Sequence, residues 1–270
     1  MKKMRKIIAI VLVLVMALNF NVISFAGTGN DFVYEGKVYK IIEDNESKLI
    51  VETENENFVV RASLDYTTRE VLLDVIGLQE TETAIATLNE SEYTVTYRVS
   101  TPEDSENGIS GYIFENQTNG EMYNGAMIST MSSITIPLWM GIGQAAINAL
   151  LALGKAIIVG SVAWVAVEEI ITTIETSDED YFEARIDNAS DCVYVGDSIS
   201  RSQALTRIKL NNELYGVFCR TERLAYNLAD VYSKTDEGPV YHANCDKVGY
   251  WPHYHSTKSY QAVHIWFPGV

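Results

Sequence analysis

NFVVRASLDY, residues 57–66, alternates apolar and polar side chains from Val60 to Tyr66. Successive side chains of a strand point to opposite faces of a sheet, so this pattern predicts a strand with one buried face. The same period of two recurs in FVYEGKVYKII (32–42), KLIVET (48–53), REVLLDVIG (69–77), EYTVTYRVS (92–100) and SGYIFEN (110–116). Asn119-Gly120, in the segment that follows, is the residue pair that a tight hairpin turn favours. Residues 27–130 are therefore predicted to form an acidic, antiparallel β-rich domain.

The first 26 residues have the features of a secretory signal peptide. Basic residues within the first six positions precede the apolar run 7–18, and Ser24-Phe25-Ala26 offers the small residues that a signal peptidase requires. We expect a secreted or extracellular protein, with Gly27 as the first mature residue.

The charge of the chain limits its partners. The net charge is −16 at pH 7, and removal of the basic leader would make it more negative. Such a protein repels nucleic acid and anionic lipid at long range, and the sequence shows no clear nucleic-acid binding surface. The three cysteines, Cys192, Cys219 and Cys245, are too few for a disulfide scaffold. They allow one disulfide with one thiol left over, or a single metal ligand, and Cys219 is expected to pack as a small apolar side chain.

The composition changes abruptly at residues 134–171, ITIPLWMGIGQAAINALLALGKAIIVGSVAWVAVEEII, where Lys155 alone interrupts the apolar run before Glu168. We predict an apolar helical segment over residues 131–177, and three interpretations are open. The segment could be a stop-transfer helix, although the acidic residues that follow it lend that topology no support. It could be a buried helical hairpin that turns near Leu153-Gly154-Lys155. It could also be a hairpin that inserts into membranes when it is released, which would make the protein membrane-associated.

Residues 178–270 are predicted to form a small α+β domain that contains all the histidines. CVYVG and ELYGVFC read as strands, and Ser200 with Gln203 forms the capping-box pattern of a helix start. The overall prediction is an α+β protein: an amino-terminal antiparallel β domain, a central apolar helical hairpin and a small carboxy-terminal α+β domain.

The four histidines, His242, His253, His255 and His264, lie close to the end of the chain. On a strand, His253 and His255 project from the same face, about 6 to 7 Å apart. Together with His264 they are candidate ligands of a metal ion, for which zinc is the expected choice, and His242, Cys245 or Asp246 could complete the site. Without a metal, the four histidines are candidate catalytic acids and bases, with Arg220, Lys258 or Tyr260 stabilising developing negative charge.

The order of these segments resembles that of secreted toxin-like proteins of Gram-positive bacteria. The matching residues are TNGEMYNGA in the β-rich half, and CVYVGDSISRSQALTRI, GPVYH, PHYH and HIWF in the carboxy-terminal domain. The resemblance implies a toxin-like or bacteriocin-like effector that acts on a target cell or membrane, with an immunity protein as partner. Two functions stay open. One is a hydrolase, such as a nuclease, that acts through the histidines. The other is a non-enzymatic protein that is membrane-active, or binds the cell envelope, through the apolar hairpin.

Overall fold

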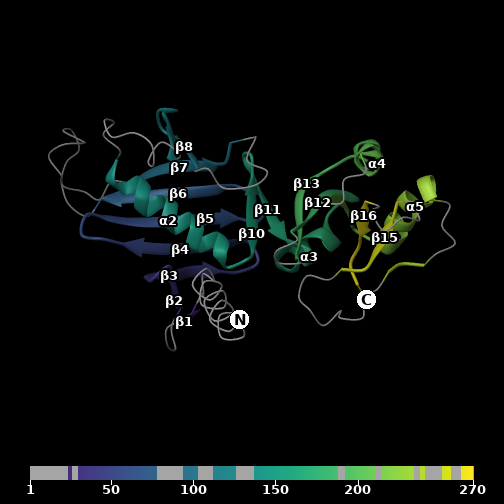
Figure 1. The fold of residues 1–270 in the computed structure, drawn as a ribbon, viewed down its shortest axis with the longest axis horizontal. Coiled ribbons are helices and arrows are strands. Elements are labelled where there is room, and N and C mark those ends of the chain that lie inside the picture. Colours follow the sequence, from purple (N-terminus) through teal and green to yellow (C-terminus); the bar gives the residue numbers. More distant parts are fainter. Residues whose placement is uncertain are drawn as a thin grey trace, which may run out of the picture.

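The computed structural model describes residues 24–25, 30–77, 94–102, 112–125, 137–187, 192–210, 214–233, 238–240, 251–256 and 263–269. Figure 1 shows two sheets along the long axis of the molecule, with the amino-terminal sheet at one end and the histidine-bearing strands at the other.

The amino-terminal sheet is an antiparallel meander in which each strand pairs with the next one along the chain. Its strands are β1 (Ser24–Phe25), β2 (Asp31–Tyr34), β3 (Lys37–Asp44), β4 (Lys48–Glu54), β5 (Phe58–Asp65), β6 (Val71–Gly77), β7 (Thr94–Ser100), β8 (Ile113–Asn116) and β9 (Met122–Asn124). The predicted antiparallel β domain is therefore confirmed. Its first strand, which pairs with β2, uses two residues of the predicted signal segment.

One face of this sheet is covered by helix α2 (Leu138–Ala152), which contacts β4, β5 and β6 (Figure 1). Alternate residues of β5, from Phe58 to Leu64, are buried beneath it, as their period of two predicted. The helix comes close to the sheet at Gly143, where an added Cβ would lie 2.5 Å from Leu73 Cδ2. The Trp139 ring stacks on Tyr97 at a centroid distance of 4.2 Å. The apolar character of this helix is thus explained by the sheet that it covers.

The predicted apolar helical hairpin over residues 131–177 is wrong in its second half. The chain does turn at Gly154, which has a φ of +77°, but a β-hairpin follows the turn instead of a second helix. Its strands are β10 (Ala156–Val159) and β11 (Val162–Ala166), and the short helix α3 (Val167–Thr176) comes after them. The two strands are rich in the β-branched residues Ile and Val, which favour strands. The prediction missed this because an unbroken apolar run shows no periodicity that distinguishes a strand from a helix.

None of the helices in the described part of the chain is long and apolar enough to cross a membrane. In place of the second helix of the predicted hairpin, the structure has β10, β11 and α3. Lys155, the charge that interrupts the apolar run, has a structural role at the turn. Its Nζ lies 2.7 Å from Asp44 Oδ1 and 3.0 Å from Glu169 Oε2, so it ties the end of β3 to α3.

The second sheet is mixed, with the strand order β10-β11-β13-β12-β14-β16-β15. Its remaining strands are β12 (Tyr181–Asp187), β13 (Cys192–Ser198), β14 (Tyr215–Cys219), β15 (His253–His255) and β16 (His264–Trp266). All its pairs are antiparallel except β14 with β16. Helices α4 (Arg201–Lys209) and α5 (Glu222–Ser233) pack on this sheet, and α4 begins with the predicted capping box of Ser200 and Gln203.

The two sheets share a hydrophobic core. One continuous cluster of buried side chains runs from Leu73 in β6, through Ile147 in α2 and Val165 in β11, to Phe218 and Trp266 near the histidines. A smaller cluster lies beneath α4 and α5, on the other side of the second sheet.

Candidate metal centre

His253, His255 and His264 lie on two neighbouring antiparallel strands at the end of the second sheet. In the register of β15 and β16, His255 is directly opposite His264, and His253 is opposite Trp266. Residues two apart on a strand share a face, and directly opposed residues share it too. The three imidazoles therefore project from the same side of the sheet.

The residues between the histidines fix which side that is. Tyr254 and Ile265 alternate with the histidines and belong to the cluster beneath α4 and α5. The Tyr254 ring stacks on Phe267 at a centroid distance of 5.6 Å, and its hydroxyl donates to Glu222 on α5. Because these apolar residues are held under the helices, the histidines occupy the opposite face.

Gly216 allows β16 to reach its position. Val217 and Phe218 of β14 pair in parallel with Ile265 and Trp266, next to this glycine. A Cβ on Gly216 would lie 2.2 Å from the backbone oxygen of His264 and 2.5 Å from Cζ3 of Trp266. Only a residue without a side chain permits this approach, which is one of the uses of glycine inside a strand.

The three rings are close enough to share one ion. His253 Nε2 lies 3.2 Å from His255 Nε2. One ring nitrogen from each of the three histidines lies within 4.8 Å of the others. Tetrahedral zinc with bonds of about 2.0–2.1 Å separates its nitrogen ligands by roughly 3.3 Å, so the His253–His255 pair already has this spacing and His264 requires a shift of up to about 1.5 Å. The chain therefore contains a three-histidine group that could hold a metal ion.

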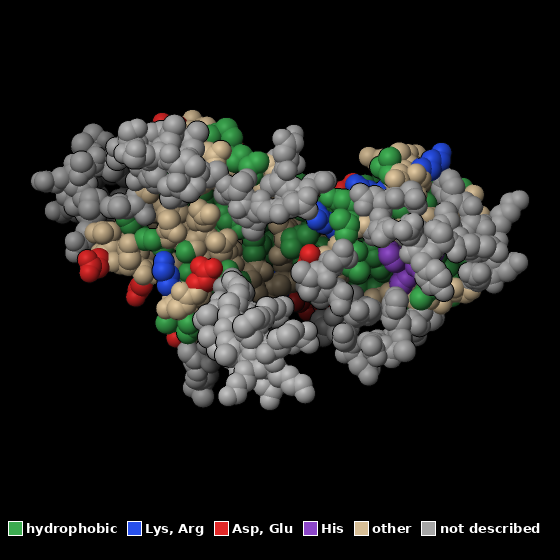
Figure 2. Space-filling model, in the orientation of Figure 1, with side chains coloured by type: hydrophobic (Ala, Val, Ile, Leu, Met, Phe, Trp, Pro, Cys, Tyr) green, Lys and Arg blue, Asp and Glu red, His purple; other side chains and the backbone are tan. Residues whose placement is uncertain are grey.

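Contacts behind the rings hold them in place. His253 is only 2 % exposed, and its Nδ1 lies 3.1 Å from the backbone oxygen of Trp251. A carbonyl oxygen only accepts, so Nδ1 is the protonated nitrogen and Nε2 carries the lone pair that a metal requires. The His264 ring stacks on Trp266, with centroids 5.1 Å apart and planes 15° apart. His255 and His264 are half-buried, and Figure 2 shows histidine side chains at the surface of this part of the molecule.

Glu168, in the first turn of α3, lies near Trp251, two residues before His253. Burial raises the pKa of its carboxyl group, and its own backbone N–H and the Trp251 indole partly oppose this shift. The Trp251 ring also meets Phe218 edge to face at 5.7 Å. Trp251 therefore connects the strand of His253 to α3 and to the shared core.

Sequence reasoning missed these supporting residues. The glycine in the middle of ELYGVFC was the one available signal for Gly216, because a strand glycine often marks the close approach of another chain segment. Nothing in the sequence pointed to Glu168 as a neighbour of Trp251.

Several other predicted site residues lie outside the described residues. They are His242, Cys245, Asp246, Lys258 and Tyr260.

Arg220 and Cys219 do lie in the described part of the chain. Arg220 forms an ion pair with Asp180 and donates to the backbone oxygen of Ser177, so its guanidinium is engaged there. Cys219 is fully buried, as predicted, and burial raises the pKa of its thiol well above the ordinary value. It is therefore unsuited to act as a nucleophile.

No protein family model, curated protein or solved structure matches this chain. The resemblance to secreted toxin-like proteins stays a prediction, and it rests on the quoted segments alone. The candidate site must be judged by its own geometry.

Proposed function

We propose that this protein is a secreted, toxin-like effector whose carboxy-terminal part binds zinc through His253, His255 and His264 and uses it for hydrolysis. The observation that carries the proposal is the convergence of three imidazoles from two adjacent strands within reach of one ion. The signal-like leader supports secretion. The proposal extends to a target cell and an immunity protein only through the resemblance stated above.

Hydrolysis follows from the number of ligands. Among the described residues, His253, His255 and His264 would hold the zinc ion, and an ion with three protein ligands would supply an activated water for attack on a carbonyl or phosphoryl group at neutral pH. His255 and His264 are partly exposed, so solvent and a substrate can reach this group. The negative charge of the chain disfavours long nucleic acids as substrates, and small esters or phosphodiesters meet less repulsion.

A second candidate function uses the same residues without metal. The 3.2 Å between His253 Nε2 and His255 Nε2 is also a hydrogen-bond distance, provided that His255 Nε2 carries a proton. One ring would then hold a proton while its neighbour accepts one, as general acid–base catalysis requires.

The test begins with zinc content and affinity. We expect the purified chain to bind zinc at a ratio of one to one, measured by elemental analysis and by competition with a chromogenic chelator. His253→Ala, His255→Ala and His264→Ala should each lower the affinity at least tenfold, which corresponds to about 1.4 kcal/mol of binding free energy. Tyr254→Phe is the matched control because its side chain lies between two of the ligands and faces the opposite side.

Hydrolysis of an activated phosphodiester, bis(p-nitrophenyl) phosphate, is then followed with and without zinc. Zinc-dependent turnover that disappears in His264→Ala supports the proposal. Turnover that survives removal of zinc supports the acid–base pair instead. Zinc binding without turnover, abolished by Cys245→Ser or His242→Ala, would mean a closed structural site and would refute hydrolysis.

A further inference from the structure

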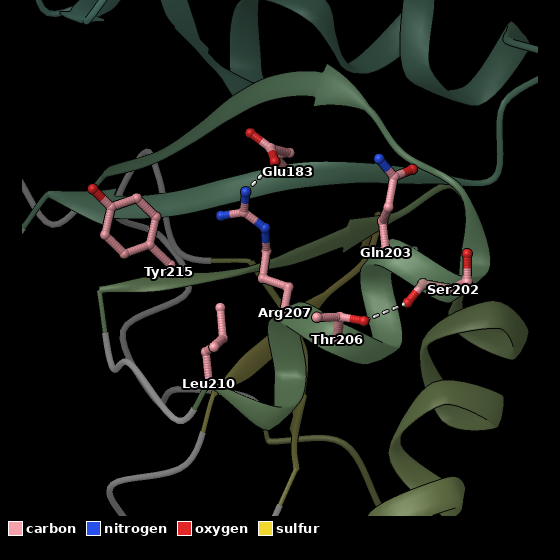
Figure 3. A pocket seen from close by; sticks show the side chains of 7 residues that line it. All are labelled: Glu183, Ser202, Gln203, Thr206, Arg207, Leu210 and Tyr215. Atoms are coloured by element: carbon pink, nitrogen blue, oxygen red, sulfur yellow. Dashed lines mark hydrogen bonds and ion pairs between the residues drawn. The ribbon is translucent and has the colours of Figure 1, made fainter. Parts of the chain in front are cut away.

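A second candidate site lies on the other face of the same sheet. A pocket of about 680 Å³ lies between helix α4 and strands β12 and β14 (Figure 3). Its strand residues are Glu183 and Tyr215, and Tyr215 points away from the histidine face because the adjacent Gly216 faces it. Pockets of 300 to 1,000 Å³ are typical for small ligands, so this one can hold a molecule of one or two rings.

The charges in the pocket cancel. Arg207 on α4 forms an ion pair with Glu183, and in Figure 3 its guanidinium points at that carboxylate. Both side chains are only partly exposed, 22 % for Arg207 and 26 % for Glu183. These are the only two charged side chains that line the pocket among the described residues. An ionic ligand would meet only charges that are already neutralised by each other, whereas an uncharged ligand needs no counter-charge.

The polar groups of the lining offer both donors and acceptors. Gln203 Oε1 accepts from the backbone N–H and the hydroxyl of Ser200, so its amide NH₂ is left to donate to a ligand. Thr206 donates its hydroxyl hydrogen to the backbone oxygen of Ser202 at 3.0 Å, which leaves the lone pairs of that hydroxyl to accept. Arg207 has further N–H groups, and Glu183 has a second carboxylate oxygen.

One wall of the pocket is apolar. The Tyr215 ring and the Leu210 side chain, which is 73 % exposed, lie on the same side of Arg207 (Figure 3). The ring is held by Trp164, which meets it edge to face at 6.2 Å, and by Arg185, which donates to its hydroxyl at 3.2 Å. The guanidinium groups of Arg185 and Arg207 also lie over the ring, 5.2 and 5.8 Å from its centroid, so Leu210 supplies the more open part of this wall. An exposed leucine beside a fixed aromatic ring provides an apolar surface for a ligand with an apolar face.

We propose that this pocket binds a neutral saccharide. A sugar has no net charge, its hydroxyl groups both donate and accept, and its ring presents a face of C–H groups to an aromatic or apolar wall. These three properties match the neutral ion pair, the mixed donors and acceptors, and the Tyr215 and Leu210 wall in turn. The pocket would hold the protein on a glycan while the histidine face remains accessible.

The experiment titrates the full chain with neutral mono- and disaccharides (glucose, N-acetylglucosamine, maltose and cellobiose) by calorimetry and saturation-transfer NMR. Glucuronate and inorganic phosphate serve as charged probes. We expect at least one neutral sugar to bind with a millimolar dissociation constant, equivalent to about −4 kcal/mol, and the charged probes to bind more weakly.

Two variants locate the binding. Glu183→Gln keeps the shape of the side chain and should weaken the sugar about tenfold, and Thr206→Val should weaken it several-fold. Thr176→Val on α3 is the matched control, because Thr176 makes the same hydrogen bond to the backbone of its own helix away from the pocket. If Glu183→Gln does not fold, Thr206→Val and its control decide the question. Absence of sugar binding, preference for a charged probe, or equal affinity in Thr206→Val and Thr176→Val would overturn the proposal.

Discussion

Replacement of Gly216 by alanine should damage the fold and the metal site together. The added Cβ would lie 2.2 Å from the backbone oxygen of His264, although real Cβ contacts shorter than 3.0 Å are essentially never seen. The clashing atom is backbone, so no rotamer change can relieve the overlap. Strand β16 must move away from β14 by roughly 1 Å, and an overpacking change of this kind costs about 1 to 3 kcal/mol.

The shift has two measurable consequences. For a chain of this length, each kcal/mol lowers the melting temperature by about 2 to 4 °C, so a fall of roughly 2 to 12 °C is expected in thermal unfolding followed by circular dichroism. The ring nitrogens already have to close from up to 4.8 Å to the roughly 3.3 Å of a tetrahedral site, so a further displacement of His264 by about 1 Å should prevent it from joining the other two histidines on one ion. The zinc affinity, measured by chelator competition, should fall by at least about tenfold.

Gly141→Ala is the control for this experiment. Nothing lies within 4 Å of a Cβ added at Gly141 in α2, so alanine should leave zinc affinity unchanged and stabilise the helix by up to about 1 kcal/mol. If Gly216→Ala binds zinc as tightly as the natural chain, then β16 does not depend on this close contact, and the geometry inferred for His264 is wrong.

Three further perturbations test the parts of the fold that support the site. Lys155→Met removes both ion pairs at the turn after α2 and should lower the free energy of unfolding by about 1 kcal/mol, and by less at high salt. Urea denaturation at two salt concentrations measures this loss. A loss that is independent of salt would contradict the electrostatic explanation. Gly143→Ala places a methyl group 2.5 Å from Leu73 Cδ2 and should lower the free energy of unfolding by about 1 to 3 kcal/mol. In a chain that already carries Leu73→Ala, the same substitution should cost much less, because the clashing atom is gone. A double variant whose loss is simply the sum of the two single losses would argue against the contact. Burial raises the folded-state pKa of Glu168, so the native state holds its proton more tightly and stability falls as the pH rises from about 4.5 through the raised pKa. Glu168→Gln should therefore raise the melting temperature, relative to the natural chain, more at pH 7 than at pH 4, and an equal difference at both pH values would refute the assignment.

The amino-terminal sheet could be predicted from sequence because one of its faces is buried and the other is not. Val60, Ala62 and Leu64 alternate with the polar residues Arg61, Ser63 and Asp65, and α2 covers the face on which the apolar residues lie. In a strand with one buried and one exposed face, apolar residues recur at every second position, so the strand can be predicted from the sequence.

The segment after Gly154 gave no comparable signal. Ala156–Val159 and Val162–Ala166 are apolar at every position, so neither a period of two nor one of 3.6 stands out. The helical prediction failed there for that reason. The β-branched residues on either side of Gly160 were the information that favoured strands.

The candidate site was predictable in part. The spacing of His253 and His255 places both on one face of any strand, and this needs no tertiary information. The position of His264 depends on the register of β16 against β15 and on the contact of β16 with Gly216, which are set by packing of distant segments. The role of His242 as a further ligand or catalytic residue stays a prediction, because His242 lies outside the described residues.

Because the two sheets share one hydrophobic core, proteolytic cleavage between them would disrupt both parts of the chain. Cleavage near Asp178 would leave β10 and β11 behind, although both belong to the sheet that carries the histidines. The liberated fragment would expose the β13 edge that pairs with β11, and the buried partners of Phe218 and Trp266 in the other half would be lost with it. Such a fragment would be prone to aggregate, so a protein built in this way is better suited to act as an uncut chain.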